Sequence, residues 1–253
     1  MYGDAFTGIG RYTAEITKYF FSQTEIDGKK IQWVIFLNEP EYSAFDFPKN
    51  VKKVCVNSPH YSWAEQTNFL KILNQEHCDL VHFTHFNVPY FYNKKFVVTI
   101  HDTTLSFYPG DASWLKKFVY KKIISNTITR AKKIITISEN TKTDVQKLFK
   151  VPNGKILKIW NGLTKDFRPI SGTEKVQICD KFKLPTQFLF YSGVWKSHKN
   201  LKRLFLALAQ SDKKMSLVLT GNPDKKLMGI VKKLKIEDQI FTVGNQNIFI
   251  SIA

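Results

Sequence analysis

The segment Gly193–Asn200 carries the residues best suited to bind an anion. It follows the apolar run Phe188–Tyr191 and precedes the amphipathic stretch Leu201–Ala209. This order predicts a strand, a glycine turn and a helix, whose first turn presents backbone N–H groups and the positive end of the helix dipole. The candidate anion ligands around this helix start are Gly193, Lys196, Lys199 and Asn200. An ordinary strand-to-helix turn is the alternative explanation.

A second candidate is His101, which ends the β-branched run Val97–Ile100. The run predicts a buried parallel strand, and ligands of open α/β sheets bind at the carboxyl ends of such strands. Asp102 either orients the imidazole or caps the following turn through Thr103 or Thr104. The alternative for the histidine is a loop residue hydrogen-bonded to its own turn.

Two further histidines, His82 and His85, flank another predicted strand end. We interpret them as structural, because the sequence places no third metal ligand beside them. The cysteines Cys55, Cys78 and Cys179 are far apart and form no Cys-x-x-Cys. This spacing argues against a disulfide scaffold or a zinc site and fits a reducing compartment.

Near the amino end, Gly8 and Gly10 predict a glycine loop ahead of a helix that begins at Arg11. Glycine reaches positive φ and lets the backbone approach a diphosphate or a sugar. A tight turn before a helix explains the two glycines equally well. A loop of this kind normally follows a first strand, which this sequence does not show.

Short apolar runs alternate with helical patterns along the chain, which predicts parallel sheets covered by helices. The predicted strands of the first series are Ile31–Leu37, Val51–Val56, Leu80–Phe83, Phe96–Ile100, Lys133–Ile137 and Ile156–Trp160. The predicted helices of this series are Arg11–Phe21, Trp63–Glu76, Ala112–Arg130 and Glu139–Phe149.

The pattern stops at Asn161–Thr173, which we interpret as a linker between two Rossmann-like domains. A second series follows. Its predicted elements are the strands Phe188–Ser192, Ser216–Thr220 and Gln239–Val243 and the helices Leu201–Ala209 and Asp224–Leu234. We therefore expect an α/β fold with one domain over residues 1–165 and a second over residues 166–253.

Composition limits the classes of function. A hydrophobic fraction of 43% and an aromatic fraction of 14% are typical of a folded globular protein. The net charge of +17 comes mostly from lysine, with only four arginines: Arg11, Arg130, Arg168 and Arg203. Because readers of nucleic-acid bases favour arginine, we do not expect nucleic acid as the partner. No apolar run is long enough to span a bilayer, so we expect a soluble or surface-attached chain.

Taken in order, several segments make the chain resemble the retaining glycosyltransferases of family 4. The matching segments are Thr7–Tyr12, Val98–Asp102, Ile135–Asn140, Asn161–Gly162, Phe167–Pro169, Gly193–Asn200 and Leu217–Gly221. No single segment is specific, but the ordered set covers residues 7–243. It is most similar to the branch that builds bacterial surface polysaccharides, which includes mannosyltransferases.

The resemblance implies a GT-B fold, in which an acceptor-side and a donor-side Rossmann-like domain face one cleft. It also implies transfer of a hexose such as mannose, with retention, from a GDP- or UDP-linked sugar to a lipid-linked or polysaccharide acceptor. By this resemblance His101 and Lys199 are catalytic, and Gly8, Gly10, Gly193, Lys196 and Asn200 bind the donor or its diphosphate. Arg11 and Asp102 support them. The co-substrate is the nucleotide sugar, and no further cofactor is expected.

No metal is expected, because the sequence contains no Asp-x-Asp, the signature of metal-dependent glycosyltransferases. Two features depart from the family pattern. Val194 stands where many members have an arginine, and the donor-side Glu-x7-Glu pair does not occur in this sequence. We therefore expect a chain truncated at both ends, with its first strand missing, its second domain incomplete and its activity low or absent. The alternatives are a non-catalytic module of the same fold, a sugar-nucleotide 2-epimerase or a basic nucleic-acid-binding protein.

The helix predicted at Ala112–Arg130 mixes lysines with aromatic residues. Its lysines are Lys116, Lys117, Lys121 and Lys122. An ordinary amphipathic helix with snorkelling lysines is one explanation. The other is a patch that attracts anionic headgroups, at about 1 kcal/mol per basic residue. The second fits a cytoplasmic enzyme bound peripherally to the inner face of the membrane, where lipid-linked acceptors lie.

Overall fold

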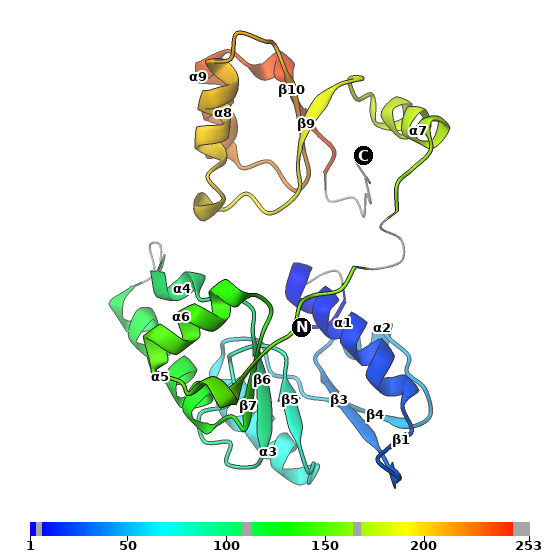
Figure 1. The fold of residues 1–253 in the computed structure, drawn as a ribbon, viewed down its shortest axis with the longest axis vertical. Helices are drawn as coiled ribbons and strands as arrows, with labels where there is room; N and C mark the ends of the chain where they lie inside the picture. Colours follow the sequence, from blue (N-terminus) through cyan, green and yellow to red (C-terminus); the bar gives the residue numbers. More distant parts are fainter. Residues whose placement is uncertain (4–6, 108–112, 164–167, 245–253) are drawn as a thin grey trace. The chain divides into compact units, whose positions relative to one another are not determined.

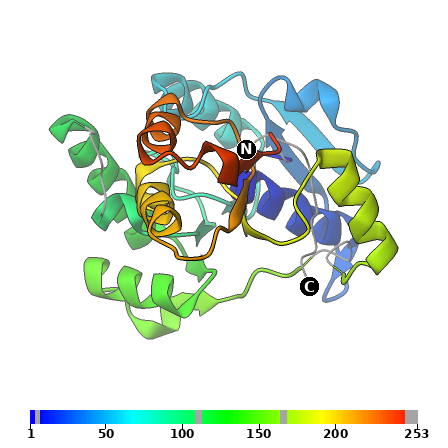
Figure 2. The same cartoon turned by 90° about the horizontal axis from the view of Figure 1, so that it is seen from above.

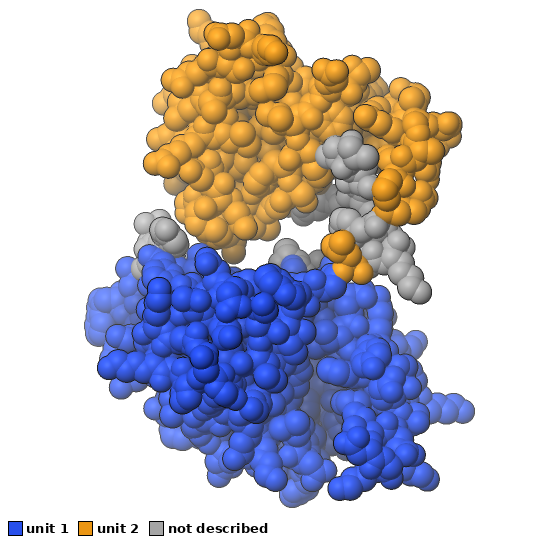
Figure 3. All heavy atoms as spheres, viewed as in Figure 1, with its two compact units in different colours: residues 1–162 blue, residues 163–253 orange. Residues whose placement is uncertain are grey.

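The computed structural model describes residues 1–3, 7–107, 113–163 and 168–244. The chain divides into two compact units, residues 1–162 and residues 163–253, each described here by itself (Figures 1 and 3). The sequence pattern places the domain boundary at 165/166. No helix among the described residues is both long enough and apolar enough to cross a membrane.

The first unit contains two parallel sheets. The strands β3 (Trp33–Leu37) and β4 (Val51–Cys55) form one of them. The second has the order β5-β6-β7-β8. Its strands are β5 (Val81–Phe83), β6 (Phe96–Ile100), β7 (Lys133–Thr136) and β8 (Ile156–Lys158). A short antiparallel hairpin, β1 (Glu25–Ile26) with β2 (Lys29–Lys30), precedes them.

The helices of the first unit surround these sheets (Figure 1). They are α1 (Thr7–Ser22), α2 (Glu41–Ala44), α3 (Trp63–Gln75), α4 (Thr104–Phe107), α5 (Trp114–Arg130) and α6 (Glu139–Phe149), with the 3-10 turn η2 (Asn153–Lys155). Serine side chains cap α3, α5 and α6, as expected where a hydroxyl accepts from an N–H of the first turn.

The core of the first unit is divided between its two sheets. One cluster joins Leu73 of α3, Ile124 of α5 and Val145 of α6 to the buried strand residues Val98 and Ile134. The other cluster contains Tyr2, Phe21, Ile35 and Leu37, with the aromatic residues around α1, β3 and β4 packed against it.

The second unit has a three-stranded parallel sheet of order β11-β10-β9. Its elements are α7 (Gly172–Phe182), β9 (Phe188–Tyr191), η3 (Ser197–Lys199), α8 (Leu201–Ala209), β10 (Ser216–Leu219), α9 (Lys225–Leu234), η4 (Glu237–Gln239) and β11 (Ile240–Thr242). In both views α8 and α9 lie together on one side of the strands and α7 on the other (Figures 1 and 2). Phe205, Leu217 and Val231 are central to its core.

The predicted α/β architecture with parallel sheets is confirmed. Two details of the prediction were wrong. Helix α1 begins at Thr7 rather than at Arg11, so the predicted glycine loop is its first turns. The stretch assigned to a linker ends inside α7, whose first turn is held by a reciprocal capping box between Ser171 and Glu174.

Candidate functional site

His101 lies directly after β6, at the carboxyl end of the four-stranded sheet. Its Nε2 is 2.8 Å from the carbonyl oxygen of Thr84, which follows the neighbouring strand β5. A carbonyl oxygen only accepts, so Nε2 carries the proton and Nδ1 of the neutral ring is an acceptor. The hydrogen-bond partner that orients the His101 ring therefore lies at the end of the neighbouring strand and not in the turn that follows His101 itself.

Tyr12 of α1 holds the other side of this imidazole. Its ring meets that of His101 edge to face, with ring centres 4.8 Å apart. Its hydroxyl lies 3.0 Å from Oγ1 of Thr99, which in turn lies 2.9 Å from Nε2 of His82. These contacts link α1, β5 and β6 beside His101.

The histidines of this site are held neutral by their surroundings. Burial lowers the pKa of His101, against the opposing effects of its bond to the Thr84 carbonyl and the charge of Asp102. Burial, aided by His101, lowers the pKa of His82 to about 4. A neutral imidazole with a free acceptor nitrogen at a sheet edge can take a hydrogen bond from a hydroxyl group.

Asp102 caps the turn that follows it, which is the second of the two roles considered for this residue. Its Oδ1 accepts from the backbone N–H of Thr104 at 2.9 Å, which caps the short helix α4. Its charge also raises the pKa of His101, as the smallest of the three influences on that ring. Asp102 therefore influences the imidazole electrostatically, through the charge of its carboxylate.

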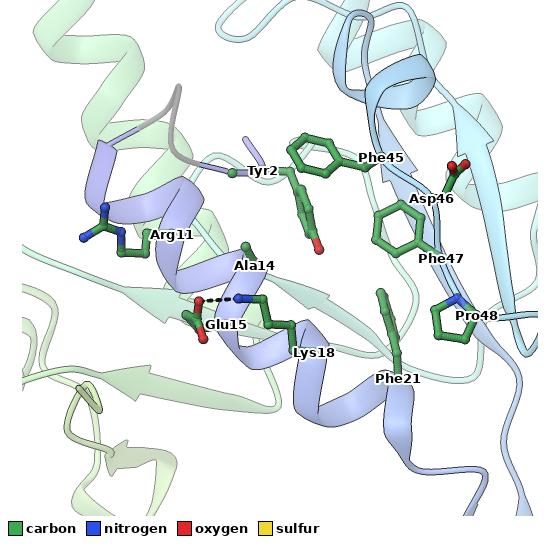
Figure 4. A pocket seen from close by; sticks show the side chains of 11 residues that line it. Tyr2, Arg11, Ala14, Glu15, Lys18, Phe21, Phe45, Asp46, Phe47 and Pro48 are labelled. Atoms are coloured by element: carbon green, nitrogen blue, oxygen red, sulfur yellow. Dashed lines mark hydrogen bonds and ion pairs between the residues drawn. The ribbon is translucent and has the colours of Figure 1, made fainter. Parts of the chain in front are cut away.

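The glycine pair and Arg11 lie on α1. Gly8 is exposed and helical rather than at positive φ, with open space where a Cβ would stand. Gly10 is buried two residues further along the same helix, and its carbonyl accepts from the N–H of Gly3 at 3.2 Å. Gly8 therefore supplies no positive φ, because the segment continues the helix. That Gly8 and Gly10 bind the donor stays a prediction. Arg11 borders a pocket of about 510 Å³ walled by aromatic residues of α1 and the α2–β4 connection (Figure 4).

A buried carboxylate near the carboxyl ends of β4 and β5 was not predicted. Glu65, in the first turn of α3, accepts from the Asn87 side chain and from the backbone N–H of Tyr61. His85 lies in the same region, where burial is the main influence that lowers its pKa to about 3. Tyr12 and Glu65 are thus the polar residues that sequence reasoning missed, although Tyr12 ends the segment Thr7–Tyr12 used for the resemblance.

In the second unit, the turn after β9 is held by Thr220. Gly193 has a φ of +151° and its N–H donates to Oγ1 of Thr220 at 3.1 Å. Trp195 Nε1 donates to the carbonyl oxygen of the same threonine at 2.7 Å. The backbone oxygen of Gly193 also lies 3.0 Å from where a Cβ of Gly221 would stand. The turn therefore requires glycines in close approach.

The residues after this turn form the predicted basic helix start. Lys196 precedes the 3-10 turn Ser197–Lys199, and Asn200 adopts left-handed φ of 59° before α8. The Asn200 side chain makes no capping bond to the first turn of α8. The exposed basic side chains gathered over these residues are Lys196, His198, Lys199, Lys202 and Arg203. Charge and helix N-terminus thus coincide here, as anion binding requires.

The predicted site residues therefore form two groups on different units. His101, Asp102, Gly8, Gly10 and Arg11 belong to the first unit, and Gly193, Lys196, Lys199 and Asn200 to the second. That both groups line one cleft stays a prediction. Among the described residues, no group of three or more histidine, cysteine, aspartate or glutamate side chains could hold a metal ion.

Solved structures place this fold among the GT-B glycosyltransferases. Anabaena HepE in complex with UDP and glucose is similar with a TM-score of 0.69 at 15% identity, over 97% of this chain and 68% of that one. A glycosyltransferase from Rickettsia africae gives a TM-score of 0.59 at 18% identity, over 95% of this chain and 66% of that one. The lipopolysaccharide outer core galactosyltransferase WaaB gives a TM-score of 0.58 at 16% identity, over 97% of this chain and 66% of that one.

The sequence identifies the family. Residues 29–167, more than half of the chain, match the model of Glycosyltransferase Family 4, so the chain belongs to that family. It is 24% identical over 164 residues to the O-antigen chain mannosyltransferase RfbU of Salmonella typhimurium, covering 64% of this chain and 42% of that protein. It is 25% identical over 120 residues to O-antigen chain mannosyltransferase B of Escherichia coli, covering 45% of this chain and 30% of that protein. The chain thus spans less than half the length of these curated relatives.

Proposed function

We propose that this chain serves the retaining transfer of a hexose from a nucleotide sugar to a lipid-linked or polysaccharide acceptor. The observation that carries the proposal is His101, whose ring is neutral, fixed through Nε2 to Thr84 and held by Tyr12 at the carboxyl end of β6. Nδ1 of such a ring can accept from a sugar hydroxyl and orient it. Mannose is the sugar we favour, since both curated relatives are mannosyltransferases.

The basic group at the start of α8 suits the donor's diphosphate. Negative charge grows on the nucleoside diphosphate as the glycosidic bond breaks, so a cation there stabilises the transition state more than the ground state. Lys196 and Lys199 are exposed beside the helix N-terminus and supply this charge. We propose that they act without a metal ion.

The nucleotide is UDP or GDP in this proposal. HepE has been solved with UDP and with UDP-glucose, and its fold is similar to that of this chain. GDP is the alternative that a mannosyl donor would carry. The backbone of the Gly193 turn, held by Thr220, is the surface against which the diphosphate would lie.

Helix α5 is the element that we propose for contact with the membrane, where a lipid-linked acceptor lies. The amino-terminal half of this helix exposes Trp114, Leu115 and Phe118, of which Trp114 is 77% exposed. Lys122 lies 5.5 Å over the Phe118 ring, and the neighbouring lysines are exposed as well. Apolar side chains interleaved with cations suit the interface of an anionic membrane. We propose that this helix brings the enzyme to the inner face of the cytoplasmic membrane.

Calorimetric titration of the protein with GDP-mannose and with UDP-glucose tests the donor site. We expect one of them to bind, and Lys199→Gln to weaken that binding at least roughly tenfold, since bonds to charged groups contribute about 1.5–3 kcal/mol. Lys213→Gln is the matched control, because Lys213 is exposed on the same unit but lies between α8 and β10. Absence of binding by both sugars, or equal losses in both variants, contradicts the proposal.

Transfer itself is tested with the donor that binds and a lipid-diphosphate-linked saccharide. Because the donor-side Glu-x7-Glu pair does not occur in this sequence, we expect turnover to be low. The anomeric configuration of the product, read by proton NMR coupling, should match that of the donor. His101→Gln should lower turnover while leaving donor binding within about threefold. Donor binding without any transfer would support the non-catalytic module instead.

A further inference from the structure

An exposed tyrosine adopts a strained backbone conformation in the connection between β4 and α3. This residue, Tyr61, has φ of +61°. The left-handed region is unfavourable for a bulky aromatic residue, and such a conformation persists only where the surrounding contacts enforce it. The side chain is nevertheless 63% exposed, so it is not held there by burial in the core. Strain without burial is typical of binding sites rather than of core positions.

The buried carboxylate of Glu65 holds this conformation. Its Oε2 accepts from the backbone N–H of Tyr61 at 2.7 Å and also from the side chain of Asn87. Ser62 closes the same turn, because its hydroxyl donates to the carbonyl oxygen of Pro59 at 2.6 Å. The left-handed turn at Tyr61 is therefore fixed by the first turn of α3 and by the segment that follows β5.

His85 fixes the hydroxyl oxygen of Tyr61 and leaves its proton available. The imidazole is neutral, because burial lowers the pKa of His85 to about 3. The backbone N–H of Asn87 donates to Nδ1 at 3.4 Å, so the ring carries its proton on Nε2. Nε2 lies 3.4 Å from the Tyr61 hydroxyl, and the two rings meet edge to face. Because Nε2 donates to the hydroxyl oxygen, the hydroxyl hydrogen of Tyr61 can be donated to a ligand.

Asp102 supplies a carboxylate oxygen within electrostatic reach of this hydroxyl. Burial is the main influence that raises the pKa of Tyr61, and the charge of Asp102 contributes to the same shift. The carboxylate is exposed, and its Oδ1 caps α4. No described residue donates a hydrogen bond to its Oδ2. A donor group beside the Tyr61 ring and an acceptor group therefore lie in the same neighbourhood.

These groups suit a sugar better than an anion. The face of an aromatic ring is negative and attracts the C–H groups on the apolar side of a sugar ring. The Tyr61 hydroxyl donates and Asp102 accepts, which suits sugar hydroxyl groups, since each of them can do both. A phosphate group, by contrast, would be repelled by the charge of Asp102.

We infer that Tyr61 is a specificity-determining residue that stacks on a sugar ring of the acceptor, whose hydroxyl groups bond to the Tyr61 hydroxyl and to Asp102. The inference rests on the proposed function and names the saccharide as the part of the acceptor that this site selects. Glu65 and His85 are then positioning residues, which hold the backbone and the hydroxyl of Tyr61. His101 directly precedes Asp102, so the stacked sugar lies near the imidazole.

The test titrates the protein with the methyl glycosides of mannose, galactose and N-acetylglucosamine and follows its amide signals by NMR. At least one glycoside should shift the signals of Tyr61, His85 and Asp102. Tyr61→Ala should weaken this binding at least roughly fivefold, because the stacking surface is lost. Tyr19→Ala is the matched control, since Tyr19 of α1 is 66% exposed, and it should leave the affinity unchanged.

Stability separates a binding role of Tyr61 from a structural one. Glycine adopts a left-handed φ without strain, so Tyr61→Gly should unfold at a higher temperature than Tyr61→Ala. Both variants should bind the glycoside equally weakly, because both lack the ring. An alanine variant that is more stable than the glycine variant would contradict the strain and overturn the inference.

Donor binding, measured on the same protein, distinguishes this inference from the proposed function. A protein that binds a nucleotide sugar but none of the glycosides would overturn the inference and leave the proposed function standing. Glycoside binding without binding of a nucleotide sugar would contradict the proposed donor and leave the saccharide site standing. Inorganic phosphate is the comparison ligand. If phosphate shifted the same three signals and no glycoside did, the site would bind anions and the inference would be overturned.

Discussion

The rings of Tyr12 and His101 meet edge to face, with their planes at 88° and their centres 4.8 Å apart, although 89 positions separate them in the sequence. The contact places the amino-terminal turns of α1 beside the carboxyl end of β6. With the bond from His101 Nε2 to the Thr84 carbonyl, it fixes the imidazole on two sides. Tyr12 therefore has the geometry of a positioning residue for His101.

Substitutions of Tyr12 separate its ring from its hydroxyl. Tyr12→Phe keeps the ring and loses the bond to Thr99, so it should cost about 1 kcal/mol of stability. Tyr12→Leu also loses the edge-to-face contact, worth about 0.5–1.5 kcal/mol more. NMR titration of His101 should show a pKa nearer the ordinary value in the leucine variant than in the phenylalanine variant, because water gains access to the ring. Identical pKa values in both variants would contradict the positioning role.

Stability should fall as the pH is lowered from neutrality. Burial lowers the pKa of His82 to about 4, so between the ordinary value near 6.5 and that value the unfolded chain binds a proton that the folded chain does not. Stability is complete above the unfolded value and decreases toward pH 4, by roughly 3 kcal/mol for this group. His85, with a pKa lowered to about 3, acts in the same direction.

Urea unfolding of the wild type and of His82→Gln between pH 7.5 and 4.5 measures this effect. The variant should be less stable at pH 7.5, because it disturbs the contact with Thr99, but its stability should depend less steeply on pH. Parallel pH dependences for the two proteins would show that the pKa of His82 is the same in the folded and the unfolded chain, which contradicts the prediction.

Two glycines of the second unit should respond in opposite ways to alanine. Gly221 has φ of +90°, and its Cβ would lie 3.0 Å from the Gly193 oxygen and 3.3 Å from the Trp195 ring. Gly221→Ala should therefore cost about 1–3 kcal/mol. Gly229 lies inside α9 with open space around it, so Gly229→Ala should stabilise by about 0.5–1 kcal/mol. Thermal unfolding distinguishes these outcomes, and a neutral Gly221→Ala would show that the turn relaxes.

The strands could be predicted where apolar runs have clear ends. The bounds of β6 and α6 follow from sequence, because Phe96–Ile100 is a continuous β-branched and aromatic run and Ser138 caps the next helix. Helix α7 was missed because none of its residues is buried, although its capping box is visible as Ser171 followed by Glu174. The start of α1 was misplaced because the helix packing of this segment overrides the low helix propensity of Gly8 and Gly10.

The site could be predicted only in part. The position of His101 follows from the end of β6, but its partner Thr84 depends on the β5–β6 register, which no local pattern fixes. Its contact with Tyr12 depends on how α1 packs against the sheet. The division into two sheets in the first unit was also not predictable, because an apolar run indicates that the faces of a strand are buried and not which strands it pairs with.

Binding of the protein to lipid vesicles should depend on α5. Its lysines are Lys116, Lys117, Lys121 and Lys122, and at about 1 kcal/mol each their joint replacement by glutamine should weaken binding to anionic vesicles roughly 100-fold or more. Replacing Trp114 and Phe118 by serine should weaken binding to anionic and to neutral vesicles alike, because their insertion does not depend on headgroup charge. Cosedimentation with phosphatidylglycerol and with phosphatidylcholine vesicles measures both effects.

The matched control for this experiment removes the same charge from the exposed side of α9. Its four lysines are Lys225, Lys226, Lys232 and Lys233. If the net charge of +17 alone attracted the protein to anionic lipid, both quadruple variants would lose binding equally. We expect the α9 variant to retain most of its binding, because α9 lacks exposed aromatic residues beside its lysines. Equal losses in the two variants would assign the attraction to overall charge and contradict a docking role for α5.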